Sequence, residues 1–447
     1  MVYNKYIGII GGTGTIGSII VKYLLQLQTH FHVLIGGRRS IKEISMSTFY
    51  NSERLKYNQM NYNNDVELDN FCSQCLLVIN AVGPSFKIND KIALHALRNN
   101  CHYIDIGGYG ILRDLLKPYE KSIEAQKLCF IIGVGWMPGI SGVFSKTIIE
   151  THLNSPENTN FNIYYGAVDN WSYSSTYDLA ASSMGKTHSY VYSHGKEIQV
   201  SPFRYTHHKF FPFIGHKKIC MPSFDEQLTQ LATSLKQIRK ISTFIMLNDY
   251  ISMGKFMFIK IFYKHNLNKA TLMLQDDYQR LVKKENKWGS VICQVSKIEP
   301  ERKIDTFYYL YTKNNLLYTA LPAVITTQYI LEGKTKIGLN CLCDSLNCQS
   351  FMSDLDFYGI KYSYYEHKKK ILVCMLWLCA IACFTGFPWI FFSWDVIHSY
   401  MGIHDIPSDL TIVLFREECL FFGFFCIYFL FLRNIEKYKG LISFCSF

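Results

Sequence analysis

The amino-acid sequence predicts an α/β protein in three parts: a doubly wound parallel sheet, a mixed α/β region and a C-terminal apolar helical extension. Three observations support this. A strand-like run near the start passes through a glycine turn into a helical pattern. Apolar strands and helical patterns then alternate up to about residue 150, which is typical of a parallel sheet. Long apolar runs lie beyond residue 370.

The bulk composition limits the classes of function. A chain of 447 residues with 49% hydrophobic residues is long enough for two or three domains. The net charge of +11 is not gathered in one Lys/Arg block with interleaved aromatics, so no nucleic-acid partner is expected. No secretory signal opens the chain, because the first apolar run belongs to the predicted nucleotide fold. The catalytic region is therefore expected in the cytoplasm, with reduced cysteines.

The cysteine pattern does not predict a metal site. Cys72 and Cys75 form one close pair, and Cys341, Cys343 and Cys348 form a second cluster. Neither has a further pair at the spacing that zinc ligands require.

The stretch from Lys5 to Gly17, KYIGIIGGTGTIG, is the first element. Its isoleucines form a strand, its glycines form a tight turn, and a helical pattern starts at Thr15. This order gives the dinucleotide-binding fingerprint in its required context. Glycines let the backbone approach a pyrophosphate, and the first N–H groups of the helix point at its charge. An ordinary strand–helix turn is the alternative. The predicted cofactor contacts here are Gly12, Thr13, Gly14, Thr15, Ile16 and Gly17.

The end of the second strand, Phe31 to Ile35, indicates which cofactor is preferred. An NAD site usually has an acidic residue here to hold the ribose 2′-OH. This chain instead has Arg38, Arg39 and Ser40. Arginine binds a phosphate through two parallel N–H donors. The sequence therefore favours NADP(H), with one of the two arginines expected to be a solvated loop charge.

The next strands end in loops at the edge of the sheet where ligands bind. The strand at 76–80 is followed by small residues that allow close approach to a nicotinamide, namely Ala81, Val82, Gly83, Pro84 and Phe86. A helix at 89–100 leads to a strand that ends at Asp105. That carboxylate could orient a substrate amine or cap the next helix. A helix at 111–126, a strand at 129–133 and a Gly/Pro turn at 134–142 follow.

Four stretches follow one another in the order of a known family: Gly11 to Gly17, Asn80 to Pro84 with Phe86, Cys101 to Asp105, and Gly133 to Gly135 with Pro138 and Gly139. Together they resemble the saccharopine dehydrogenase-like reductase family. A fifth stretch, Leu321-Pro-Ala through Ile330-Leu-Glu-Gly333, resembles the family's returning helix. The resemblance extends over about residues 3–340.

The resemblance implies a domain order. A Rossmann NADP-binding domain at 1–150 is interrupted by an inserted mixed α/β substrate and dimerisation domain at 151–320. The chain returns to the first domain at 321–360, and the apolar helical extension occupies 361–447. A homodimer is one arrangement that the inserted domain would allow.

The resemblance also implies an activity: hydride transfer between NADP(H) and a C–N bond of an imine or amino-acid-like substrate. In the family the loop at 81–86 lies near the nicotinamide. Candidate catalytic residues are Tyr103, Asp105 and Tyr109, and candidate substrate contacts are Trp136, Met137 and Gly139. Gly107, Gly108 and Tyr109 stand where many members carry an acid, so an ionic contact to the substrate is expected to be missing there. Two alternatives stay open: a membrane-tethered nucleotide-binding protein without catalysis, and a lipid double-bond reductase.

The middle region shows strand-type alternation at 161–165 and 307–311, which is typical of an antiparallel sheet with one exposed face. A helix is expected at 177–184. The hydroxyls of Ser174, Ser175 and Thr176 precede it and would serve as a cap or hold a substrate carboxylate. The basic, apolar stretch at 235–263 is interpreted as a partly exposed helix packed on the sheet. A membrane-touching helix is the alternative.

The C-terminal extension contains the uncharged run 371–392, preceded by three lysines. At about 1.5 Å per residue it reaches roughly 33 Å, enough to cross a hydrocarbon core. A second run at 410–432 is interrupted by Arg416, Glu417 and Glu418. Positive flanks on both outer ends fit a membrane hairpin. The alternative is an apolar cap on the core or at a dimer interface. The expected partners are thus a small-molecule substrate and a membrane.

Overall fold

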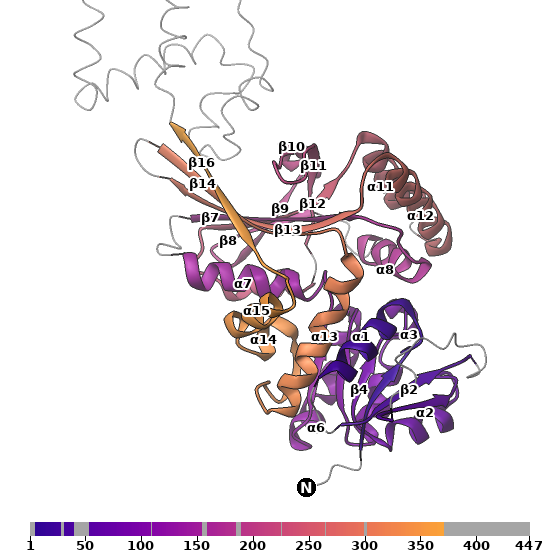
Figure 1. Ribbon diagram of the computed structural model, residues 1–447. Helices are drawn as coiled ribbons and strands as arrows, with labels where there is room; N and C mark the ends of the chain where they lie inside the picture. Colours follow the sequence, from indigo (N-terminus) through magenta and orange to yellow (C-terminus); the bar gives the residue numbers. More distant parts are fainter. Residues whose placement is uncertain are drawn as a thin grey trace, which may run out of the picture. The chain divides into compact units, whose positions relative to one another are not determined.

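The fold is described by a computed structural model, in which residues Met1–Ile371 form one compact unit. The residues that the structure describes are 5–27, 31–39, 53–108, 110–153, 159–184, 189–224, 226–263, 265–298 and 302–370. They contain two sheets, shown in Figure 1.

The first sheet has seven parallel strands in the order β15-β6-β5-β4-β1-β2-β3. The chain starts at the centre, winds outward to β3, returns to build the other half, and adds β15 from far along the sequence. This confirms the predicted doubly wound parallel sheet. Its strands are β1 (Tyr6–Ile10), β2 (Val33–Gly37), β3 (Leu55–Gln59), β4 (Cys75–Asn80), β5 (His102–Asp105), β6 (Cys129–Ile132) and β15 (Gly338–Cys341).

Helices cover both faces of this sheet. Ile9 faces α1, α7 and α13, whereas Val78 on the next strand faces α2 and α4. In Figure 1, α13 lies beside α1 although about 300 residues separate them in the sequence. The helices are α1 (Thr15–Gln26), α2 (Asp65–Cys72), α3 (Ser85–Ile88), α4 (Lys91–Arg98), α5 (Gly110–Leu116), η2 (Lys117–Tyr119), α6 (Glu120–Ala125), α7 (Ile140–His152), α13 (Asn315–Leu331), α14 (Leu342–Ser345) and α15 (Cys348–Phe357).

The second sheet is mixed and has nine strands, seven of them in the order β10-β11-β12-β7-β13-β14-β16, with β8 and β9 joined at β12. Its strands are β7 (Thr159–Val168), β8 (Ser189–Ser193), β9 (Lys196–Val200), β10 (His207–Phe210), β11 (Lys217–Pro222), β12 (Lys240–Leu247), β13 (Trp288–Ile298), β14 (Arg302–Thr312) and β16 (Ser363–Lys370). Its helices are α8 (Tyr173–Met184), α9 (Pro202–Tyr205), α10 (Glu226–Ser234), α11 (Tyr250–Phe262) and α12 (Leu267–Lys284).

The prediction of an antiparallel sheet with one exposed face was wrong for the centre of this sheet. Strand β7 pairs with β12 in parallel and with β13 in antiparallel orientation. Both of its faces are covered, since Phe161 packs toward α7 and Tyr164 packs on Phe211 and Phe244. An alternating pattern therefore arose here from two differently packed faces rather than from one that is exposed to water.

Two local predictions in this region also need correction. The stretch 235–263 is not one helix: its first half forms strand β12, and only α11 is helical. Helix α11 buries Phe256 and Ile259 and leaves Phe262 65% exposed, as a helix packed on one side does. Helix α8 begins at Tyr173, four residues before the predicted start.

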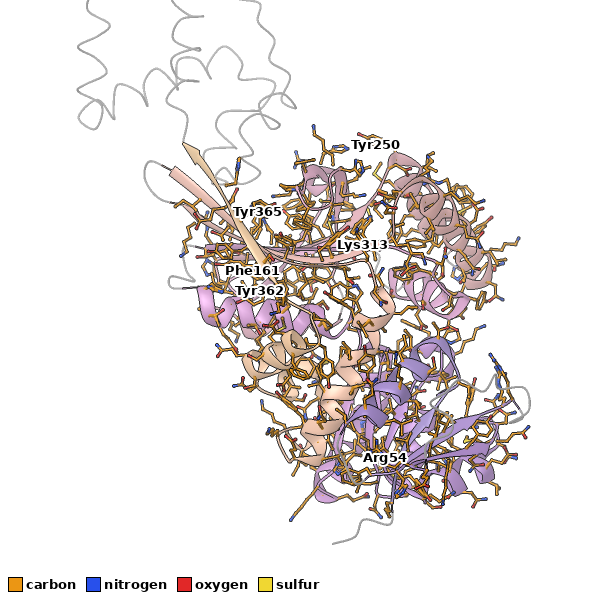
Figure 2. The ribbon with its side chains drawn as sticks, viewed as in Figure 1. Arg54, Phe161, Tyr250, Lys313, Tyr362 and Tyr365 are labelled. Atoms are coloured by element: carbon orange, nitrogen blue, oxygen red, sulfur yellow. The ribbon has the colours of Figure 1, made fainter. Side chains whose placement is uncertain are left out.

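Residues 363–370 form a strand, so the prediction that a helical extension begins at 361 was wrong at that point. Strand β16 pairs with β14. Its Tyr365, labelled in Figure 2, stacks on Phe307 with ring centroids 4.7 Å apart. The predicted membrane runs at 371–392 and 410–432 lie outside the described residues. Among the helices that the structure does describe, none combines the length and apolar character needed to cross a membrane.

Candidate functional site

The glycine turn between β1 and α1 is shaped by backbone contacts that only glycine allows. Gly11 has φ = +83°, in the left-handed region that favours glycine. A Cβ on Gly17 would overlap the carbonyl oxygen of Gly11 and lie 2.7 Å from the Cα of Gly12. Helix α1 begins at the N-cap Gly14 without a side-chain cap. Its first N–H groups are thus not engaged by a capping side chain, and they fit a phosphate.

The backbone at the end of β2 is fixed by two side chains of β3. Tyr57 donates its hydroxyl to the carbonyl oxygens of Gly37 and Arg39, and Gln59 donates to that of Arg38. The side chains of Arg38 and Arg39 are exposed. Two cations thus stand on a fixed loop beyond β2, where a 2′-phosphate is expected. Ser40, predicted with them, lies outside the described residues.

The loop after β4 lies directly beside the glycine turn. Ala81 donates its N–H to the carbonyl of Ile10 at 2.9 Å, and Val82 donates to the side chain of Asn80 at 3.0 Å. A Cβ on Gly11 would lie only 3.0 Å from the carbonyl carbon of Ala81. The two predicted cofactor segments therefore meet at one edge of the sheet.

Asp105, at the end of β5, accepts hydrogen bonds from two neutral side chains. Asn80 donates to its Oδ2 at 2.8 Å and Tyr103 at 2.6 Å. The carboxylate is only 2% exposed, and its Oδ1 has no hydrogen-bond partner among the described residues. Burial raises the pKa of Asp105, opposed in part by Tyr103, Asn80 and the amides of Gly107 and Gly108. Its charge is thus poorly compensated.

The structure brings Tyr103 and Asp105 together but buries the tyrosine completely. Burial, reinforced by the neighbouring carboxylate, raises the pKa of the Tyr103 hydroxyl well above its usual value. The geometry therefore makes Tyr103 a hydrogen-bond donor to Asp105. Tyr109, the third candidate, lies outside the described residues.

Asp178 on α8 is a second buried carboxylate beside the candidate site, and the sequence does not predict it. Its Oδ2 accepts from the N–H of Ser85 at 2.9 Å, and its Oδ1 accepts from that of Phe86 at 3.1 Å. Burial raises its pKa to about 6, the two amides oppose that shift, and the nearby Asp105 carboxylate adds to it. No motif marks this residue, because its partners lie more than 90 positions earlier in the chain.

Replacing Asp178 by asparagine should flatten part of the pH dependence of stability. The folded protein holds this proton up to about pH 6, whereas an unfolded chain releases it near pH 4. Between these values the folded state binds more protons, so the wild-type free energy of unfolding falls as pH rises, by at most about 3 kcal/mol from this group. Urea unfolding of both proteins from pH 4.5 to 7.5 measures the difference. Parallel curves would contradict the expectation.

The loop after β6 carries the predicted substrate contacts and lies against the second sheet region. Trp136 is 5% exposed and meets the ring of Tyr318 edge-on at 5.0 Å. Gly139 donates its N–H to the side chain of Gln227 at 2.8 Å. The indole N–H of Trp136 has no partner among the described residues. Met137 is half-buried in the same core. These residues form a junction between α10, α13 and the first sheet.

The hydroxyls expected to cap α8 are arranged differently. Ser172 accepts the N–H of Ser175 at 3.2 Å, and its carbonyl accepts the hydroxyl of Thr176 at 2.9 Å. Ser174 instead lies against Gly83, where a Cβ would approach its own Cβ to 2.9 Å. The first turn of α8 thus packs on the loop after β4.

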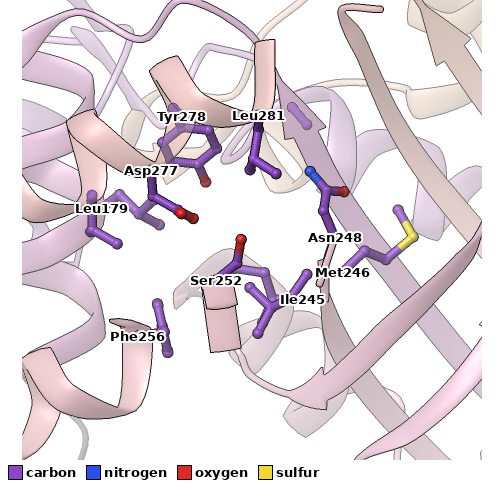
Figure 3. Close-up of a pocket in the computed structure, with 12 residues that line it drawn as sticks. Leu179, Ile245, Met246, Asn248, Ser252, Phe256, Asp277, Tyr278 and Leu281 are labelled. Atoms are coloured by element: carbon purple, nitrogen blue, oxygen red, sulfur yellow. The ribbon is translucent and has the colours of Figure 1, made fainter. Parts of the chain in front are cut away.

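A separate small cavity of about 20 Å³ lies among β12, α8, α11 and α12 (Figure 3). Asp277 and Ser252 point into it, but Arg280 already bonds both at 2.9 and 3.1 Å. The space is enough for one water molecule. Because Arg280 already occupies Asp277 and Ser252, we assign the cavity no ligand.

The comparisons with known proteins support the dinucleotide-binding interpretation of the glycine turn. Residues 7–128 match the family described as the saccharopine dehydrogenase NADP-binding domain. A search of curated proteins found no match. NADP(H), the cofactor predicted from the end of β2, is the one in the family's description.

The fold is similar to that of a solved structure, apo saccharopine dehydrogenase (L-Glu forming) from Saccharomyces cerevisiae, with 15% identity, a TM-score of 0.56, and coverage of 81% of this chain and 100% of that one. An engineered D-amino acid dehydrogenase bound to NADP⁺ has 10% identity, a TM-score of 0.41 and coverage of 76% and 94%. The motif resemblance is supported in the first part of the chain: residues 7–128 match the NADP-binding domain of the saccharopine dehydrogenase family.

Proposed function

We propose that this protein is an NADP(H)-dependent oxidoreductase that transfers a hydride to or from the carbon of a C–N bond. The substrate class is an imine or an amine derived from an amino acid. NADP(H) supplies or accepts the hydride. The chain's own residues hold the pyrophosphate at Gly12–Gly17, the 2′-phosphate at Arg38 or Arg39, and the nicotinamide beside the loop 81–86.

The observation that supports an imine or amine substrate is that two buried carboxylates lack a cationic partner among the described residues. Asp105 and Asp178 are both buried, the Asp105 carboxylate adds to the raised pKa of Asp178, and no Lys, Arg or His side chain among the described residues forms an ion pair with either. Buried carboxylates are normally paired. A protonated imine or an ammonium group would compensate them. Both oxygens of Asp178 accept backbone amides, whereas Oδ1 of Asp105 makes no hydrogen bond within bonding geometry among the described residues. Asp105 is therefore the residue proposed to contact that group.

The proposed chemistry needs a positive nitrogen next to the carbon that receives hydride. Carboxylates near that nitrogen stabilise the iminium form, in which the carbon is most electrophilic. When hydride arrives, the C=N π electrons become a lone pair on nitrogen and the cation is neutralised. The carboxylate of Asp105 can then supply or accept the proton that the amine exchanges with water.

The test uses the full-length protein and NADPH. NADPH oxidation is followed with mixtures of primary amines and 2-oxo acids, with simple ketones, and with α,β-unsaturated lipids. We expect oxidation that requires both an amine and an oxo acid. NADPH binding without turnover on any set would favour the non-catalytic alternative, and oxidation by unsaturated lipids alone would favour the double-bond reductase.

The arginines after β2 should set the preference for NADPH over NADH. A charge-assisted hydrogen bond to phosphate contributes about 1.5–3 kcal/mol, so Arg38→Ala or Arg39→Ala should weaken NADPH binding roughly 10- to 100-fold. NADH lacks the 2′-phosphate, and its affinity should change little. Fluorescence titration of both nucleotides checks this. Equal loss for NADH and NADPH, or no loss in either variant, would contradict the assignment.

A further inference from the structure

Helix α8 of the second sheet region rests on the loop that follows β4 in the first. One carboxylate, Asp178, accepts two consecutive backbone N–H groups, those of Ser85 and Phe86 at 2.9 and 3.1 Å. One turn earlier in α8, Ser174 lies so close to Gly83 that a Cβ there would approach it to 2.9 Å. The contact therefore spans the whole stretch from Gly83 to Phe86.

The chain does not supply this capping group locally. The N-cap of the short helix α3 is Pro84, which has no side-chain acceptor. An aspartate more than 90 residues away in sequence takes that role, although burying it is costly enough to raise its pKa. A cap provided from another structural region exists only while that region is in place.

The loop is also confined on its other side. A Cβ on Gly107 would overlap the hydroxyl of Ser85, so the loop after β5 packs directly against the start of α3. Lys87 lies over the ring of Tyr177 at 4.5 Å, which adds a second link from α3 to α8. The start of α3 is thus held between α8 and the loop that follows Asp105.

Helix α8 is in turn attached to the body of the second region. Its Tyr173 donates to Asn268 of α12 at 2.8 Å, and Trp171, just before it, stacks on Tyr278 at 4.8 Å. Any displacement of α12 would therefore be transmitted to α8 and to the two amides that Asp178 holds.

We infer that Asp178 is a positioning residue: it fixes the loop from Ala81 to Phe86 and, through this loop, the nicotinamide. An ordered nicotinamide therefore requires the second sheet region to be packed against the first. The phosphates, held by the glycine turn and the arginines, do not require it. The inference rests on the proposed nicotinamide position, and it is independent of the substrate class.

The test compares full-length Asp178→Asn and Asp178→Ala with the wild type. Asparagine fits the same space but accepts only one of the two amides, so its effect should be intermediate. The control is Asp90→Asn, an acid at the start of the next helix whose side chain makes no capping bond. NADPH affinity, the rotational mobility of the bound nicotinamide from time-resolved fluorescence anisotropy, and amide hydrogen exchange of residues 85–88 are measured.

For Asp178→Ala we expect exchange of the amides at 85–88 to rise roughly tenfold and nicotinamide mobility to increase, with NADPH affinity changed less than about threefold. Asp90→Asn should change none of these. Unaltered nicotinamide mobility in Asp178→Ala, even with lowered thermal stability, would overturn the inference and leave Asp178 a structural cap. If the wild type binds no NADPH, the proposed function fails, while the exchange data still report on the contact.

Discussion

Replacing Gly17 by alanine is expected to weaken NADPH binding roughly 100-fold, equivalent to about 3 kcal/mol. The added Cβ would overlap the carbonyl oxygen of Gly11 and lie 2.7 Å from the Cα of Gly12. Both neighbours are backbone atoms, so no side chain can rotate away. Helix α1 would have to move off the turn, which displaces the N–H groups expected to contact the pyrophosphate.

The matched control is Gly254→Ala, the same change in helix α11. Nothing lies within 4 Å of a Cβ at that position. Alanine has the better helix propensity, so this variant should gain about 1 kcal/mol in stability and bind NADPH as the wild type does. Nucleotide titration measures the NADPH affinity of both variants, and urea unfolding measures their stability. Wild-type NADPH affinity in Gly17→Ala would show that the turn is not the cofactor site.

The parts of the fold that could be predicted are those set by local sequence. The glycine turn needs Gly11 at positive φ and Gly17 in contact with backbone, and these requirements leave a readable spacing. The parallel strands are short apolar runs because both faces of that sheet are covered by helices. Because the strand before Asp105 is such a short apolar run, the sequence also indicated that Asp105 lies at a strand end.

The second sheet could not be predicted in the same way. Alternation in β7 reflects two covered faces, and the pattern alone does not distinguish this from one exposed face. Strand β16 reads SYYEHKKK, which shows no strand-like alternation of apolar residues, and it pairs along its whole length with β14, where Tyr365 stacks on Phe307. Such pairings depend on strand order, which the local pattern does not encode.

The electrostatics of the site depended on contacts distant in the sequence. Asp105 was a candidate from its position, but its neutral partners Asn80 and Tyr103 became evident only in the folded chain. Asp178 occurs in an ordinary helical stretch, and its role depends on amides of another region. The sequence thus predicted the cofactor and its expected contacts, but not the second buried carboxylate, Asp178, close to Asp105.

Replacing Asp105 by asparagine should separate stability from activity. The amide has the same shape, and its oxygen can still accept the hydroxyl proton of Tyr103, which lies 2.6 Å from the present carboxylate. It removes a buried charge that has no cationic partner among the described residues, so the free energy of unfolding at pH 7 should stay level or rise. Turnover of an amine or imine substrate should fall roughly 100-fold, because about 3 kcal/mol of charge pairing with the substrate nitrogen is lost.

The pH dependence of the free energy of unfolding gives a second, independent test of the Asp105 charge. Because burial raises the pKa of Asp105, the folded state keeps its proton to a higher pH than the unfolded state does, and wild-type stability falls as pH rises through that interval. Asp105→Asn should lack this fall. Tyr103→Phe is the matched control: it removes one hydrogen bond to the carboxylate, should cost about 2 kcal/mol at pH 7, and should steepen the fall. An Asp105→Asn protein with full turnover would rule out contact between this carboxylate and the reacting nitrogen, whereas an unfolded one would mean that the charge is compensated in the native state.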